Sequence, residues 1–110
     1  MANTFKNAAV ADVSNSSYDT LYAAPGSTTS VILAVALTNK TGNSVSVQVQ
    51  FFDSSASATY QLLEDVSIPG NTTLEVLQGQ KYILEASDAL KIQSGTASAI
   101  DVVAGLMEIS

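Results

Sequence analysis

Carboxylates are the residues of this chain that are best suited to chemistry. The 110 residues include ten acidic side chains and four lysines, with no His, Cys or Trp. The chain therefore lacks the usual general base near neutral pH, a thiol nucleophile, and the imidazole and thiolate ligands that bind zinc. An enzyme with this composition would have to use carboxylates and hydroxyls.

The acidic residues do not form an obvious catalytic or metal-binding pair. Glu64 and Asp65 are neighbours in a predicted strand, so their side chains are expected to point to opposite faces. Glu85 and Asp88 flank a predicted turn, where an Asp usually accepts hydrogen bonds from its own backbone. A structural role is favoured over metal binding there. We therefore expect no catalytic residue, no metal site, no cofactor and no enzymatic activity.

Asp101 has two interpretations, because it begins a strongly apolar segment near the end of the chain. It can lie at a rim and face Lys81 or Lys91, or it can be buried against a partner subunit, which is rare for an unpaired charge. Five residues are interface candidates: Phe5, Val10, Phe52, Asp101 and Met107.

The charge balance argues against several classes of partner. A formal net charge of -6 should repel polyanions, and Lys and Arg clusters that could contact phosphates are missing, so we expect no nucleic-acid partner. The longest apolar run, residues 31–37, is too short to cross a bilayer as a helix, and we expect no membrane partner. The first residues lack the apolar core of a signal peptide, which predicts synthesis and retention in a cytoplasm.

A period of two in hydrophobicity predicts β-strands as the elements that position these residues. The clearest case is residues 43–51, where Val45, Val47, Val49 and Phe51 alternate with polar side chains. Turn-forming residues at 38–43 precede this segment, so a hairpin is predicted in which strands at 29–38 and 44–52 pair antiparallel.

Further strands are predicted at roughly ten-residue spacing, which is typical of a sandwich or a small barrel. They are expected at residues 6–13, 18–23, 60–68, 72–77, 82–85, 89–93 and 99–109. We therefore predict one all-β domain over residues 1–110, an antiparallel β-sandwich of jelly-roll or immunoglobulin-like type with seven to nine short strands.

The two terminal segments carry additional expectations. Residues 1–13 form either an ordinary first strand or an extended arm that adds a strand to a neighbouring molecule. The last strand is apolar on both faces, which predicts a central position in a sheet or a contact with another subunit.

Several of these segments resemble a known class of proteins. The segments are Ile68-Pro69-Gly70-Asn71-Thr72, residues 84–91, the final residues 99–109 and the predicted hairpin at 38–49. Together they are similar to small virion proteins of tailed bacteriophages, including those that infect cyanobacteria, over roughly residues 20–109.

The resemblance implies a capsid cement or decoration protein that binds the outer head surface after assembly in the host cytoplasm. Its partners would be the major capsid protein or other virion subunits, and a homotrimer would be favoured. A head-fibre, neck or tail-attached protein is an alternative within the same class. A carbohydrate-binding module for host recognition is an alternative from another class, although such modules usually expose several aromatic side chains and this chain has no Trp.

Overall fold

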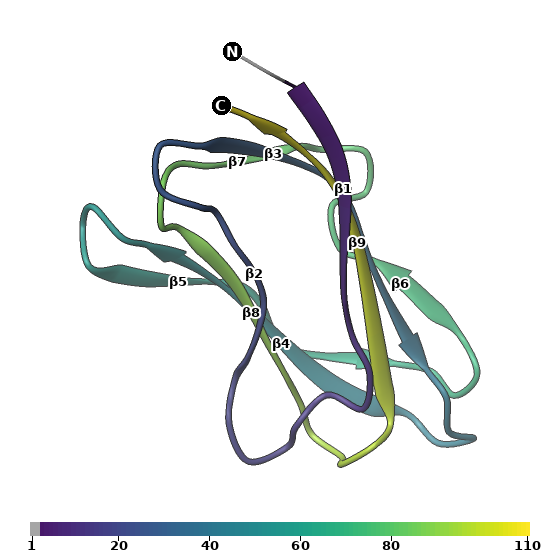
Figure 1. The fold of residues 1–110 in the computed structure, drawn as a ribbon. Coiled ribbons are helices and arrows are strands. Elements are labelled where there is room, and N and C mark those ends of the chain that lie inside the picture. The colour runs from purple at the N-terminus through teal and green to yellow at the C-terminus, as the bar shows by residue number, and fades with distance from the viewer. Residues whose placement is uncertain (1–2) are drawn as a thin grey trace.

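The protein is a sandwich of two antiparallel β-sheets, as a computed structural model that describes residues 3–110 shows (Figure 1). This confirms the predicted fold class. Over residues 3–110 the strands are β1 (Asn3–Val10), β2 (Asp19–Ala23), β3 (Thr29–Asn39), β4 (Val45–Asp53), β5 (Ala58–Ile68), β6 (Thr73–Glu75), β7 (Tyr82–Leu84), β8 (Ala89–Ser94) and β9 (Ile100–Ile109). No helix long and apolar enough to cross a membrane occurs in this part of the chain.

The strand order is that of a jelly roll. Sheet A has the order β1-β9-β3-β6, with β7 also paired to β3, and sheet B has the order β2-β8-β4-β5. Strands β6 and β7 pair with opposite ends of β3, through residues 36–38 and 30–32, so together they fill one strand position. The chain passes from one sheet to the other at most connections, which is how a jelly roll builds two four-position sheets.

The core lies between the sheets and consists of the alternate residues that the strands turn inward. Val45, Val47 and Val49 of β4 are buried, as the alternation predicts, and they face a set of aliphatic side chains from sheet A. The largest fully buried side chains are Ile32, Leu37, Ile68, Leu84, Leu90, Ile92, Ile100 and Leu106. Because no buried side-chain nitrogen or oxygen in residues 3–110 lacks a hydrogen-bond partner, the core carries no uncompensated polar cost.

Strand β9 is central in sheet A, as its two-sided apolarity predicts. It lies between β1 and β3 and pairs with both along almost its whole length. Ile100, Val102 and Leu106 face the core, whereas Val103 on the other face is 54% exposed.

The predicted hairpin between residues 29–38 and 44–52 is wrong. Strand β3 belongs to sheet A and β4 to sheet B, so the loop at 40–44 crosses between the sheets. Both sides of β3 are already occupied, by β9 on one side and by β6 and β7 on the other, and β4 pairs instead with β5 and β8.

A buried asparagine holds this crossing. The side chain of Asn39 is fully buried, and its Nδ2 donates to the carbonyl oxygens of Asn43 at 2.8 Å and Ile68 at 2.9 Å. Its Oδ1 accepts from the backbone N–H of Thr41 at 2.9 Å and from the Thr41 hydroxyl at 2.8 Å. Asn39 thus ties the end of β3 to the loop and to the end of β5.

The N-terminal segment forms a first strand of the same domain. Strand β1 begins earlier than the predicted strand at 6–13 and ends at Val10, because the chain then bends and Asp12 takes a φ of 53°. It pairs with β9 of the same chain over residues 3–10. Residues 1–2 of the predicted arm lie outside the described residues.

Candidate functional site

The outer face of sheet A presents a row of apolar side chains. Ile83 of β7 is paired with Val31 of β3, Val31 with Met107 of β9, and Met107 with Phe5 of β1. Since directly paired residues lie on the same face, these four side chains form a line across four strands. The exposed fractions of Phe5 and Ile83 are 75% and 53%.

Two further apolar residues extend this row. Val103 of β9 is 54% exposed, and Leu33 of β3 is 36% exposed. Leu33 points outward because the pairing of β3 with β9 shifts between Ile32 and Ala34, which places two successive β3 residues on the solvent side. We call this surface the apolar face; it comprises Phe5, Val31, Leu33, Ile83, Val103 and Met107.

Carboxylates border the apolar face toward the end of β3, and the exposed Lys81 and Glu85 stand on either side of β7. Glu75 stands opposite Ala36 and Asp101 opposite Thr38, both toward the end of β3. Glu75 turns its carboxylate onto the backbone N–H groups of Val35 and Leu77, at 2.9 and 3.2 Å. The apolar face therefore has apolar side chains at its centre and charged groups at its margins, an arrangement that is typical of a contact surface.

The structure brings together two of the five interface candidates and separates the others. Phe5 and Met107 are directly paired on the apolar face. Val10 is half-buried and packs against the core. Phe52 lies on the outside of sheet B, half-buried, with the Lys91 ammonium 5.2 Å from its ring centroid.

Asp101 takes part in a surface ion cluster. Its Oδ1 accepts from the backbone N–H of Asp12 at 3.0 Å and lies 3.0 Å from the Lys40 ammonium, which also contacts Asp12. The Asp101 side chain is 38% exposed, and its lysine partner is Lys40 and not the predicted Lys81 or Lys91. The Asp12 N–H and then Lys40 lower the pKa of Asp101, and the bond to Asp12 is the main cause that raises the pKa of Lys40.

The prediction for Glu64 and Asp65 is wrong, because a β-bulge places both on the outside of sheet B. The pairing of β4 with β5 shifts between Val47 and Val49, and Asp65 adopts a φ of 51°. Asp65 then accepts from Gln48 Nε2 at 2.7 Å, and Glu64 accepts from Gln61 Nε2 at 3.3 Å. A bulge commonly redirects a side chain in this way.

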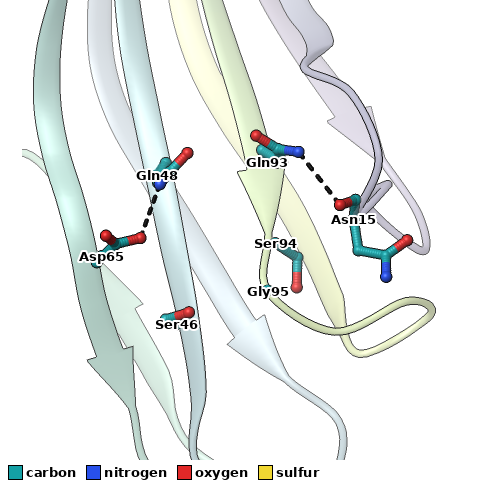
Figure 2. Close-up of a pocket in the computed structure, with 7 residues that line it drawn as sticks. All are labelled: Asn15, Ser46, Gln48, Asp65, Gln93, Ser94 and Gly95. Atoms are coloured by element: carbon teal, nitrogen blue, oxygen red, sulfur yellow. Dashed lines mark hydrogen bonds between the residues drawn. The ribbon is translucent and has the colours of Figure 1, made fainter.

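Asp65 and Gln48 belong to a small polar pocket, shown in Figure 2. The pocket has a volume of about 160 Å³, which is room for several water molecules. Its lining residues come from the β1–β2 loop, β4, β5 and the end of β8: Asn15, Ser46, Gln48, Asp65, Gln93, Ser94 and Gly95.

Internal hydrogen bonds position the pocket side chains. Gln48 Nε2 donates to Asp65, and Gln93 Nε2 donates to the Asn15 carbonyl at 3.2 Å (Figure 2). The Tyr18 hydroxyl, outside the pocket lining, donates to Gln48 Oε1. Gly95 allows a close approach of β8 to β4, because a Cβ there would lie 2.5 Å from Ser46 Oγ. The side-chain amides can donate hydrogen bonds to a small hydroxyl-bearing group, and the amide oxygens and the carboxylate can accept hydrogen bonds from a hydroxyl or a cationic group.

Asp88 has the structural role that its turn position predicts. It is 2% exposed, and its carboxylate accepts from the backbone N–H groups of Ser54 at 2.8 Å and Glu85 at 2.9 Å. Over residues 3–110, no cluster of three or more His, Cys, Asp or Glu side chains could hold a metal ion.

A polar bridge between the sheets was not predicted from the sequence. The Tyr22 hydroxyl of β2 contacts Ser30 Oγ of β3 at 2.7 Å and donates to the Glu108 carboxylate of β9. Glu108 also lies 3.6 Å from the Lys6 ammonium. Burial, followed by the bond to Glu108, raises the pKa of Tyr22 to about 12. The partners are far apart in sequence, so no local pattern identifies them.

Comparison with known proteins relates this chain to others by fold and not by sequence. No protein-family model matches it, and no curated protein sequence matches it significantly. Among solved structures, a Bacillus endospore appendage described as disulfide-linked pili matches 96% of this chain and 85% of its own, with 15% identity and a TM-score of 0.53.

Two further solved structures have the same general fold. The infectious bursal disease virus Gx strain structure matches 96% of this chain, with 10% identity and a TM-score of 0.59, and this chain spans 32% of the viral chain. The Drosophila NLP core, described in terms of pentamer formation and histone binding, has 14% identity, a TM-score of 0.50 and coverage of 96% and 98% of the two chains. At these identities the matches show a shared β-sandwich fold.

Proposed function

We propose that this protein is a non-enzymatic structural subunit of a virion, which binds other subunits through the apolar face of sheet A. More specifically, we propose a cement or decoration protein on the capsid surface of a tailed bacteriophage. The observation that carries the proposal is the row of Ile83, Val31, Met107 and Phe5 across four strands. A row of this kind is costly to expose to water unless a partner covers it.

The chemistry of the apolar face indicates the kind of partner. Its centre is aliphatic and aromatic, and charged groups stand at its margins: Glu75, Lys81, Glu85 and Asp101. This matches an interface with an apolar core and a polar rim, on a partner such as the major capsid protein. On a capsid the same modest contact is repeated many times, so that multivalency can compensate for a small affinity per contact.

The fold is compatible with this role. Jelly-roll sandwiches occur in viral capsid and lectin domains, and the likeness to the bursal disease virus structure and to the Bacillus pili is consistent with an assembly subunit. Fold-level analogy does not by itself assign a function. The apolar face does not favour a trimer over other closed oligomers, so the homotrimer stays a prediction of the resemblance.

The direct test is occupancy of phage heads. Assembled heads that lack the protein are mixed with purified protein, sedimented, and imaged by cryo-electron microscopy. We expect ordered density on the head lattice and a loss of binding for a variant with Ile83→Lys and Val103→Lys. The loss of one apolar anchor side chain costs about 1–2 kcal/mol of binding free energy, which lowers the affinity roughly 5–30-fold.

A control places one added lysine on the opposite sheet and is matched to the single variants Ile83→Lys and Val103→Lys. Gln50→Lys lies on the outer side of β4 and should leave binding to heads unchanged. Density at the neck, tail or fibres instead of the head would replace the decoration role with one of those virion roles. Equal binding of the double variant and the wild-type protein would remove the apolar face as the interface.

A carbohydrate-binding module is a second candidate, and the polar pocket of sheet B is the observation that favours it. Side-chain amides and the Asp65 carboxylate are suited to sugar hydroxyls, but no Tyr or Phe lines the pocket. Glycan-array binding that is lost in Asp65→Ala would support this function. The absence of binding to any glycan, with normal occupancy of heads, would reject it.

A further inference from the structure

The four edges of the two sheets differ in how well they are protected against pairing with another strand. In sheet B, β2 has only five residues and a register shift between Thr20 and Tyr22. The other edge, β5, is long but interrupted by bulges and carries the exposed charges of Glu64 and Asp65. In sheet A, one edge consists of β6 and β7, with three residues each. Short strands, bulges and charges are the usual means of blocking edge pairing.

Strand β1 has only one of these protections, a single lysine. It runs for eight residues, Asn3–Val10, in unbroken register with β9, and it contains no Pro and no Gly. Its single charge, Lys6, sits 3.6 Å from the Glu108 carboxylate of its own sheet. Within residues 3–110 no strand pairs with the far side of β1, so its outward backbone N–H and C=O groups are available to another strand.

We propose that β1 pairs antiparallel with β1 of a second copy of this chain, around a two-fold axis that joins two A sheets into one continuous sheet. A second copy is the best-matched occupant, because among the described strands β1 is the single long and regular open edge. An isologous pair also uses both open edges and leaves none for further growth. This pairing is a property of the chain itself and does not depend on the proposed virion role, and it is an alternative to the homotrimer that the resemblance implies.

The side chains of β1 select the register of the pair. Paired residues share a face, so a two-fold axis must pass beside a residue that faces its own counterpart. An axis at Lys6 would place two lysines directly opposite each other, which is unfavourable. An axis at Asn7 pairs residues 4–10 of both copies, sets Phe5 opposite Ala9, and places Lys6 opposite Ala8.

This register also accounts for the high exposure of Phe5. The Phe5 ring is 75% exposed in the single chain. In the pair it would lie beside the small Ala9 of the second copy, so that an aromatic ring covers an alanine across the new strand contact. The apolar face of one copy then continues onto that of the other, which doubles the surface that a larger partner can cover.

Charge changes at residue 7 test the pairing. Asn7 is exposed on the outer face of β1, so Asn7→Lys and Asn7→Glu should preserve the fold, which circular dichroism can verify. By analytical ultracentrifugation we expect the wild-type chain to form a dimer that dissociates on dilution. Each variant alone should be monomeric, since like charges would face each other, and an equimolar mixture should regain a dimer. Asn43→Lys and Asn43→Glu, in an exposed loop, are the matched controls and should remain dimeric.

Cysteine crosslinking provides a second measurement, because the natural chain has no cysteine. Single cysteines at positions 3, 5, 7 and 9 should give a disulfide-linked dimer most readily at position 7. A wild-type chain that stays monomeric at its highest soluble concentration would overturn the proposal. The proposal would also be overturned by a trimer, by dimers of the residue 7 variants that are as stable as the wild-type dimer, or by a yield of disulfide-linked dimer that is highest at another position.

Discussion

Replacing Asn39 with alanine should be one of the most damaging single changes in this protein. The buried amide makes two strong donor contacts, to the carbonyl oxygens of Asn43 and Ile68, and its oxygen accepts two contacts from Thr41. In Asn39→Ala the Ile68 carbonyl loses its partner in a buried position. An unsatisfied buried group costs about 1–3 kcal/mol, and the lost loop contacts add about 1 kcal/mol more.

The expected loss is therefore roughly 2–4 kcal/mol of unfolding free energy, out of about 5–15 kcal/mol for a typical domain. A loss of ~3 kcal/mol should lower Tm by roughly 10–20 °C in a domain of this size. Urea unfolding followed by circular dichroism measures the free energy, and calorimetry measures Tm. The transition should remain cooperative, because Asn39 stabilises the crossing between sheets and not a separate unit.

Two further variants make the Asn39 experiment specific. Asn43→Ala changes an exposed residue of the same loop that contributes only backbone groups to this network, so it should alter stability by less than about 0.5 kcal/mol. Asn39→Asp keeps the shape and the acceptor but loses the donors, so it should be at least as destabilising as alanine at neutral pH. If Asn39→Ala lies within 0.5 kcal/mol of the wild-type protein, the role assigned to this side chain is refuted.

Three other changes probe the polar contacts and the close packing. Because the pKa of Tyr22 is about 12 in the folded chain and ~10 when unfolded, its contribution is fully present below pH 10 and is lost as pH rises to about 12. Ultraviolet titration should show one late-ionising tyrosine that disappears in Tyr22→Phe. The pKa of Asp101 is lowered, so its contribution is present above ~3.9 and is lost as pH falls through the lower folded value. Asp101→Asn should cost at most about 1 kcal/mol at pH 7, measured by urea unfolding, and a larger cost would contradict a surface ion cluster. Gly70→Ala would place a Cβ 2.5 Å from the Gly42 carbonyl atoms and should cost about 1–3 kcal/mol in the same assay, whereas Gly26→Ala, with open space around it, should be neutral.

The parts of the fold that depend on local pattern were predictable. Alternation at Val45, Val47 and Val49 identified the inward face of β4, and the turn residues separated most of the strands close to their observed ends. The two-sided apolarity of residues 100–109 indicated the central place of β9. These signals survive because burial on one face of a strand imposes a period of two.

The parts that depend on distant contacts were not predictable. The turn residues at 38–43 are equally suited to a hairpin and to a crossing between sheets, and the contact of Asn39 with Ile68 decides between them. The outward direction of Asp65 depends on a bulge against β4, and the partner of Asp101 is a lysine 61 positions away along the numbering, Lys40. Single-sequence patterns carry no record of such pairings.

The pairing of β1 with β9 determines how the molecule responds to mechanical force. Asn3 stands directly opposite Ile109, so the two ends of the described chain leave from the same corner (Figure 1). A force that separates these ends acts in an unzipping geometry: it breaks the hydrogen bonds between β1 and β9 one pair after another. In a shear geometry all of these bonds would bear the force together. The domain should therefore yield at low force when stretched between its ends.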